Sequence, residues 1–143
     1  MTVCLDTNVF LQIFGRNQPY HSILRALLDG RLTLAVSTEI LLEYEEVTTK
    51  LSGTERWQDV ATLLDLLSQL HNNVRQVGPQ YRFNVITADP DDNKFSDCAI
   101  AAEADFVVTD DSHFSPLSSA GYKPQPITPN EFIRRIALTE LNE

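Results

Sequence analysis

Residues 3–10 read VCLDTNVF, a short apolar run interrupted by one carboxylate. The segment 2–5 is rich in β-forming residues, and the segment from Asn8 to Phe14, closed by Gly15, has the composition of a short helix. Asp6 therefore lies where a buried strand ends and a helix begins. A carboxylate at such a junction is either an N-cap for the helix or a functional group at the end of a strand, and this segment alone leaves both interpretations open.

The alternation of strand and helix continues along the chain. Further strands are expected at 32–37, 74–77, 106–109 and 126–127, a loop at 88–92, and further helices at 20–28, 38–51, 54–71, 93–104 and 128–141. Thr128, Pro129 and Glu131 have the pattern of a capping box for the last helix. This order predicts a single domain over residues 1–143, an α/β fold with three α/β/α layers and a mostly parallel central sheet of four to five strands.

Composition narrows the functional classes. The net charge of −9, from 20 acidic and 11 basic residues, argues against a protein that holds nucleic acid by a broad basic surface. It is compatible with a nuclease whose carboxylates surround a cation. No apolar run is long enough to span a membrane, no signal peptide is visible, and Cys4 and Cys98 both lie in apolar surroundings. We therefore expect a cytoplasmic protein with buried thiols and no membrane partner.

Three acids occupy positions where chemistry is expected in this fold class. Ligands of open parallel sheets bind outside the carboxyl ends of the strands, near the point where the strand order reverses. Asp6 follows the first expected strand, and Asp111 follows the strand that ends in FVVT. Glu43 is expected at the edge of the inward stripe of its helix, where a surface acid with a buried stem is the alternative. The residues expected in that stripe are Ile40, Tyr44, Val47 and Leu51.

Asp97 is the clearest anomaly. Its segment, FSDCAIAAEA, is apolar on nearly every side, and Asp97 shares a face with Ile100 and Ala101. An ionised carboxylate in such surroundings needs a shifted pKa, a basic partner or a metal ion. Lys94, three residues earlier, is the local candidate for a partner. A cation shared with other acids is the alternative.

Convergence of these four acids would require a cation. Oxygen ligands favour Mg²⁺ or Mn²⁺ over Zn²⁺, and no set of histidine and cysteine ligands is evident in the sequence. The histidines, His21, His71 and His113, are dispersed along the chain and are interpreted as surface residues.

Four segments together resemble the PIN-domain family: VCLDTNVF, VSTEILLEYEEV, DPDDNKFSDCAIAAEADFVVTDD and ITPNEFI. The similarity covers nearly the whole chain and is greatest to bacterial PIN-domain toxins of toxin–antitoxin systems, the VapC-like ribonucleases. It implies a Mg²⁺- or Mn²⁺-dependent endoribonuclease that hydrolyses phosphodiester bonds of RNA. It also implies an antitoxin protein as a partner and a homodimer as a common assembly.

Matched position by position, the resemblance implies a catalytic and metal-binding set made of Asp6, Glu43, Asp97 and Asp111. The family's T-x-D segment usually has a small middle residue, whereas this chain has Asp110 there. Either Asp110 or Asp111 could therefore face the metal.

Further positions match residues that line or support such sites. These are Asn8, Asp92 and Thr109, and helix capping is an equal alternative for Asp92. Arg16 and Lys94 are candidates for contacts with phosphate.

Two other functions are open. A PIN-fold binding or regulatory module without nuclease activity would be expected to have lost an acid, and all four acids are present. A phosphatase similar to the haloacid dehalogenases would use Asp6 as a nucleophile, but it would need a second aspartate where Asn8 stands.

Overall fold

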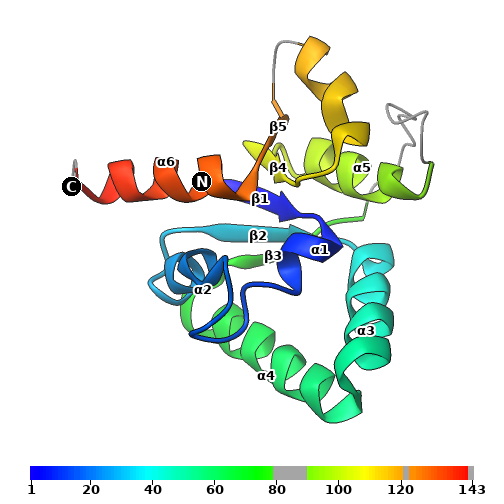
Figure 1. Ribbon diagram of the computed structural model, residues 1–143, viewed down its shortest axis with the longest axis vertical. Helices are drawn as coiled ribbons and strands as arrows, with labels where there is room; N and C mark the ends of the chain where they lie inside the picture. Colours follow the sequence, from blue (N-terminus) through cyan, green and yellow to red (C-terminus); the bar gives the residue numbers. More distant parts are fainter. Residues whose placement is uncertain (79–89, 121–122, 142–143) are drawn as a thin grey trace.

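The computed structural model describes residues 1–78, 90–120 and 123–141 (Figure 1). Five strands form one sheet in the order β3–β2–β1–β4–β5, and every neighbouring pair is parallel. The strands are β1 (Thr2–Leu5), β2 (Thr33–Val36), β3 (Val74–Gln76), β4 (Phe106–Val108) and β5 (Gln125–Ile127). The predicted α/β class is confirmed, with a sheet that is parallel throughout.

Helices cover the sheet on both faces. Helix α5 packs against β1, β2 and β4, while α2 and α4 lie on the opposite side (Figure 1). The α-helices are α1 (Thr7–Phe10), α2 (His21–Leu28), α3 (Thr38–Ser52), α4 (Thr54–His71), α5 (Asn93–Ala101) and α6 (Pro129–Leu141). Two 3₁₀ segments, η1 (Pro90–Asp92) and η2 (Ser112–Ala120), were not expected from the sequence.

Some predicted boundaries were wrong for identifiable reasons. Helix α1 ends at Phe10 instead of Phe14. Helix α5 ends at Ala101 because Glu103 takes a left-handed conformation, with φ of 52°. The Ala104 N–H donates to the Ala99 carbonyl at 2.9 Å, which completes a Schellman motif without the usual glycine. Residues 88 and 89, at the start of the expected loop, lie outside the described residues.

The inward stripe of α3 also differs from the prediction. Ile40, Tyr44 and Thr48 are buried, whereas Leu51 is 69% exposed. The spacing of four residues carries the stripe through Thr48, and Leu51 falls in the last turn, next to the junction of α3 with α4 and away from the sheet (Figure 1). This turn therefore contributes little to the core.

The strand β1 is the centre of the core. Val3, Cys4 and Leu5 are completely buried, and Cys98 of α5 is buried as well, as predicted. The register pairs Leu5 with Val108, so the next residues, Asp6 and Thr109, leave the sheet side by side. The sheet order places β1 between β2 and β4, where the chain reverses its direction of progress across the sheet. Asp6 thus stands at the topological switch point.

Helix α3 is fixed to the end of β1. The ring of Tyr44 stacks on Phe10 of α1, with ring centroids 3.7 Å apart, and its hydroxyl donates to the Leu5 carbonyl. Ser37 caps the helix as predicted, accepting from the Ile40 N–H at 3.3 Å. These contacts determine where the α3 side chains lie relative to Asp6. None of the described helices combines the length and apolarity that crossing a bilayer requires.

The opposite, amino edge of the sheet contains a stabilising carboxylate. Asp105 accepts from the Thr2 N–H at 2.9 Å and meets Lys123 Nζ at 2.6 Å. Burial opposes ionisation, but the hydrogen bonds from Lys123 and Thr2, with the charges of Lys123 and the N-terminus, lower the pKa of Asp105 below its ordinary value. The ionised form of Asp105 therefore stabilises the fold.

Asp105→Asn is expected to lower the free energy of unfolding at pH 7 by about 1 kcal/mol, the scale of a partly exposed charge-assisted contact. Because the folded-state pKa lies below the ordinary value of about 3.9, the contribution is present above that pH. It is lost as the pH falls through the folded-state pKa. Thermal unfolding followed by circular dichroism between pH 7 and the lowest pH that keeps the protein folded measures this difference.

Asp29→Asn is the matched control, since its carboxylate meets Arg31 at 3.2 Å with 56% of the side chain exposed. We expect a change within about 0.5 kcal/mol for this variant. A destabilisation by Asp105→Asn that stays constant as the pH falls would contradict the assignment.

Candidate active site at the carboxyl edge of the sheet

Asp6 is the buried centre of the site. It is only 8% exposed, and it is the N-cap residue of α1 as well as the residue that follows β1, so both sequence interpretations describe its position. Its Oδ1 accepts from the Thr7 N–H at 2.8 Å, and its Oδ2 accepts from the Thr109 hydroxyl at 2.8 Å. Two neutral donors therefore fix the carboxylate in one orientation.

The environment of Asp6 disfavours its ionised form. Burial raises its pKa, the hydrogen bonds from Thr109 and Thr7 lower it, and the nearby charges of Asp111 and Glu43 raise it again, so that the pKa lies above the ordinary value. The charges that act on Asp6 among the described residues are thus negative. A cation would relieve this repulsion.

Glu43 projects from α3 toward the same edge. Its Oε2 accepts from the Thr7 hydroxyl, and its Oε1 lies 2.6 Å from Lys94 Nζ at the start of α5. The local pair that the sequence suggested for Lys94 was Asp97, so the pairing with Glu43 corrects that alternative. Thr7, which sequence reasoning missed, contacts both acids: its N–H binds Asp6 and its hydroxyl binds Glu43.

The loop after β4 presents two adjacent acids in different ways. Asp111 is half-buried, and its N–H donates to the Thr109 hydroxyl at 2.9 Å. Asp110 is exposed and accepts from the Tyr20 hydroxyl at 3.2 Å. Burial and this contact with Asp110 raise the pKa of Tyr20. Of these two acids, Asp111 contributes to the raised pKa of Asp6.

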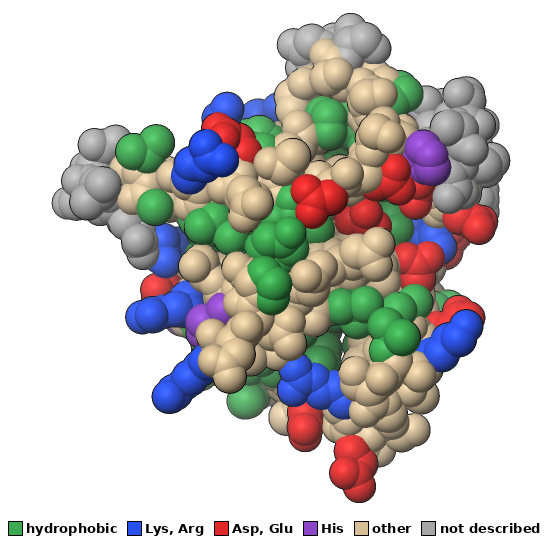
Figure 2. Space-filling view, in the orientation of Figure 1, with side chains coloured by type: hydrophobic (Ala, Val, Ile, Leu, Met, Phe, Trp, Pro, Cys, Tyr) green, Lys and Arg blue, Asp and Glu red, His purple; other side chains and the backbone are tan. Residues whose placement is uncertain are grey.

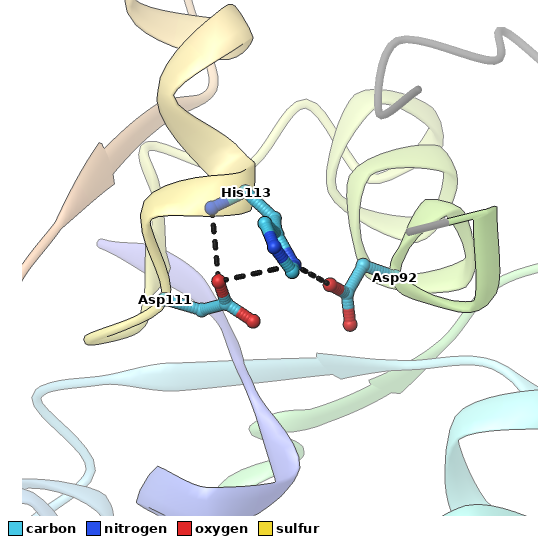
Figure 3. Close-up of side chains that lie close together, drawn as sticks. All are labelled: Asp92, Asp111 and His113. Carbon is cyan, nitrogen blue, oxygen red and sulfur yellow. Dashed lines mark hydrogen bonds and ion pairs between the residues drawn. The ribbon is translucent and has the colours of Figure 1, made fainter. Parts of the chain in front are cut away.

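His113 lies beside two acids. Its side chain is 42% exposed, so it reaches the surface as predicted, but it is not isolated there. Its Nδ1 lies 3.3 Å from Asp111 Oδ1 and 3.5 Å from Asp92 Oδ2 (Figure 3). Its backbone N–H also donates to Asp111 Oδ1 at 2.9 Å. Helix capping does not explain Asp92, because its side chain makes no capping hydrogen bond to α5. The 3₁₀ segment η2 begins at Ser112 and turns His113 back over Asp111.

These three side chains could hold a metal ion. One ligand atom from each of Asp92, Asp111 and His113 lies within 4.8 Å of the other two, and no other described group of three such residues meets this spacing. The His113 Nδ1 atom is buried and makes no hydrogen bond within the described part of the chain. A buried ring nitrogen between two carboxylate oxygens fits a cation, and the mixed nitrogen and oxygen set suits Mn²⁺ or another transition metal better than a set of oxygens alone.

The remaining predicted residues lie at different depths. Asp97 is 5% exposed on α5, and Asn8 is exposed next to Asp6. A pocket of about 250 Å³ opens over Asp6 and is lined by Asp6, Asn8, Val9, Gln12, Asp110 and Asp111. Arg16 is exposed outside this lining. Acidic side chains gather on this face of the molecule, over the region where α1 and α5 meet the end of β4 (Figure 2).

Comparisons with known proteins agree with this architecture. The sequence model of one family, described as PIN domain, matches residues 2–113. Among solved structures, a chain from the crystal structure of VapBC2 from Rickettsia felis, bound to a DNA fragment from their promoter, is similar in fold. It superposes with a TM-score of 0.55 and 15% identity, over 90% of this chain and 98% of that chain. No curated protein matches the chain.

Asp6→Asn is expected to raise the free energy of unfolding by about 1 kcal/mol at pH 7 in EDTA. The raised pKa means that ionised Asp6 destabilises the fold, so the stability of the wild type falls as the pH rises through the ordinary value of about 3.9 to the folded-state pKa. The gain should therefore vanish below that range. Urea unfolding at pH 7 and at about pH 3, below the ordinary value, measures both quantities.

Asp59→Asn, at an exposed position of α4, is the control for loss of one negative charge. We expect Asp59→Asn to leave the stability within about 0.5 kcal/mol. An Asp6→Asn protein less stable than the wild type in EDTA at pH 7 would contradict this account of the site.

Proposed function

The chain belongs to the PIN-domain family, and we propose that it is a divalent-metal-dependent endoribonuclease, the toxin of a toxin–antitoxin pair. The observation that carries the proposal is the environment of Asp6. A carboxylate that is 8% exposed lies at the switch point of a parallel sheet, with two further acids acting on its charge. Such a concentration of negative charge is useful to a protein that binds a cation there.

We propose, on the resemblance to PIN domains, that Asp6, Glu43, Asp97 and Asp111 provide oxygen ligands for Mg²⁺ or Mn²⁺. A bound cation would draw these acids closer together, since Asp92, Asp111 and His113 are the one described group of three that already has the spacing of metal ligands. His113 would add a nitrogen ligand beside Asp111, and Asp92 would add a further oxygen ligand. A divalent cation bound here lowers the pKa of a water molecule and stabilises the charge that develops on a phosphodiester during hydrolysis.

The neutral side chains of the site have a separate task. Thr109 donates to Asp6 and accepts from the Asp111 N–H, so one hydroxyl orients two acids. Thr7 does the same for Asp6 and Glu43. The two threonines thereby hold the carboxylates of Asp6 and Glu43 and the backbone of Asp111 in position, and the carboxylates keep further lone pairs available for ligands. The pocket above Asp6, with exposed Asn8 at its rim, would admit the RNA backbone.

An antitoxin protein is the proposed partner. The similar Rickettsia felis structure is of VapBC2 bound to promoter DNA, which supports a partner of that kind for this chain. The excess of acidic residues at the site favours an antitoxin segment that brings a basic side chain to the carboxylates. A homodimer is proposed on the resemblance to small acidic PIN-domain proteins.

Single-stranded RNA should be cleaved in Mn²⁺ or Mg²⁺ and left intact in EDTA. Asp6→Asn and Asp97→Asn are each expected to reduce the rate at least about 100-fold, because each removes a ligand charge from the reacting centre. Gel electrophoresis of a labelled RNA and of total RNA, with initial rates at several cation concentrations, measures the loss.

Asp59→Asn, far from the site on α4, should retain the wild-type rate. Cation binding that Asp6→Asn abolishes, without cleavage of any RNA, would identify a binding module instead of a nuclease. Hydrolysis of small phosphate monoesters without RNA cleavage would favour a phosphatase.

His113→Gln is expected to weaken Mn²⁺ binding about tenfold and to change Mg²⁺ binding much less, because imidazole is a better ligand for transition metals than for Mg²⁺. Isothermal titration of each cation into the protein without RNA gives both affinities. His71→Gln, at an exposed position, is the control. Equal losses for the two cations would show that His113 acts on the site by its structure alone.

A further inference from the structure

One basic side chain already faces the acidic site. Lys94 Nζ lies 2.6 Å from Glu43 Oε1, and only 19% of the Lys94 side chain and 26% of the Glu43 side chain are exposed. The Thr7 hydroxyl donates to the other oxygen, Glu43 Oε2. Both oxygens of this proposed cation ligand are therefore engaged by groups of the protein itself.

The position of Lys94 is not explained by its own helix. It is the second residue of α5, where the helix dipole favours anions, and the first turn of α5 contains no acidic residue. Its charge is compensated instead by Glu43 of α3, a helix that packs against α5. Lys94 therefore stands at a helix position that disfavours a positive charge, and its ammonium contacts Glu43, a residue of the candidate site. We take its role to be in that site.

The ammonium compensates only one part of the acidic cluster. The charges of Asp111 and Glu43 both raise the pKa of Asp6 and so disfavour its ionised form. The Asp92, Asp111 and His113 group joins the end of η1 to the start of η2. The charge of Glu43 is thus compensated by the Lys94 ammonium, while Asp6 and Asp111 accept hydrogen bonds from neutral groups.

We propose that Lys94 is a tethered competitor for the divalent cation at Glu43 and that its ammonium, once displaced, binds a phosphate of the RNA. The inference rests on the proposed function, since it uses Glu43 as a cation ligand. An ammonium and a divalent cation on one carboxylate repel each other, so each weakens the binding of the other. An RNA phosphate stabilises the displaced ammonium. Lys94 therefore makes the binding of cation and of RNA mutually supportive.

The test is a titration of Mn²⁺ into the full chain, followed calorimetrically, with and without single-stranded phosphorothioate RNA, which resists hydrolysis. For the wild type, the RNA should lower the Mn²⁺ dissociation constant about 3- to 10-fold, within the usual range of coupling between two ligands. For Lys94→Gln, the dissociation constant without RNA should already be lower by about that factor. Addition of RNA should then change it little.

Three variants separate this role from simpler effects. Lys50→Gln removes the same charge from an exposed position of α3 and should leave the Mn²⁺ affinity unchanged. Lys94→Arg keeps the charge and should retain the coupling. In a Glu43→Gln background, Lys94→Gln should no longer tighten Mn²⁺ binding, because the carboxylate for which the two cations compete is gone. Circular dichroism and the melting temperature establish that each variant is folded.

The outcomes distinguish this inference from the proposed function. Unchanged or weaker Mn²⁺ binding by folded Lys94→Gln would overturn the competition, even if the wild type cleaves RNA in Mn²⁺. Coupling that persists in Lys94→Gln would overturn the assignment of Lys94 to phosphate. Tighter Mn²⁺ binding with lost coupling would support the inference even if no RNA is cleaved, in which case the nuclease proposal alone fails.

Discussion

The parallel register between β1 and β4 is the constraint on which the candidate site depends. Leu5 lies opposite Val108, so Asp6 and Thr109 emerge together and can form a 2.8 Å hydrogen bond. A slip of one residue would turn Asp6 to the other face of the sheet and bury a carboxylate without its partner. The complete burial of Val3, Cys4 and Leu5 makes such a slip costly, because it would turn each of these closely packed side chains to the opposite face of the sheet.

Helix α3 brings the second element of the site to this edge. It begins at Ser37, directly after β2, and the stacking of Tyr44 on Phe10 holds its second turn against α1. Glu43 precedes Tyr44, so the aromatic contact that stabilises the helix packing also directs the glutamate toward Thr7 and Lys94. An aromatic pair of this kind contributes about 0.5–1.5 kcal/mol beyond its buried area, which is enough to fix one helix orientation. The contacts that stabilise the packing of α3 therefore also position Glu43 in the candidate site.

Local sequence patterns were sufficient for the fold but only for part of the site. Short-range rules predict strand β1, the Ser37 cap and the position of Asp6, because strand burial and helix capping depend on residues that are neighbours in the sequence. The burial of Asp97 on α5 also follows from its apolar segment. The Schellman end of α5 at Glu103 was missed because the glycine that usually marks it is absent.

The contacts that depend on tertiary structure could not be read from the chain. His113 lies 21 positions from Asp92 and 2 from Asp111, and only the turn of η2 brings its ring to both. Lys94 and Glu43 are 51 positions apart and meet through the packing of α5 on α3. A histidine placed directly after an acid-rich strand end was the available signal, and its distance in the sequence from Asp92 and from the other histidines concealed it.

The acids at the two edges of the sheet show how the same residue type can stabilise or destabilise a fold. Asp105, at the amino edge, has a lysine and a backbone N–H as partners, and its pKa is lowered. Asp6, at the carboxyl edge, also has two hydrogen bonds, yet burial and two neighbouring acids raise its pKa. The difference is the missing positive charge. The fold gives Asp105 a lysine side chain as its positive partner, but it leaves the destabilising charge of Asp6 at the switch point. Unfavourable charge is thereby concentrated where a bound metal ion can relieve it. Lys94 fits this pattern as a partial relief: it compensates Glu43 and leaves Asp6 without a positive partner among the described residues.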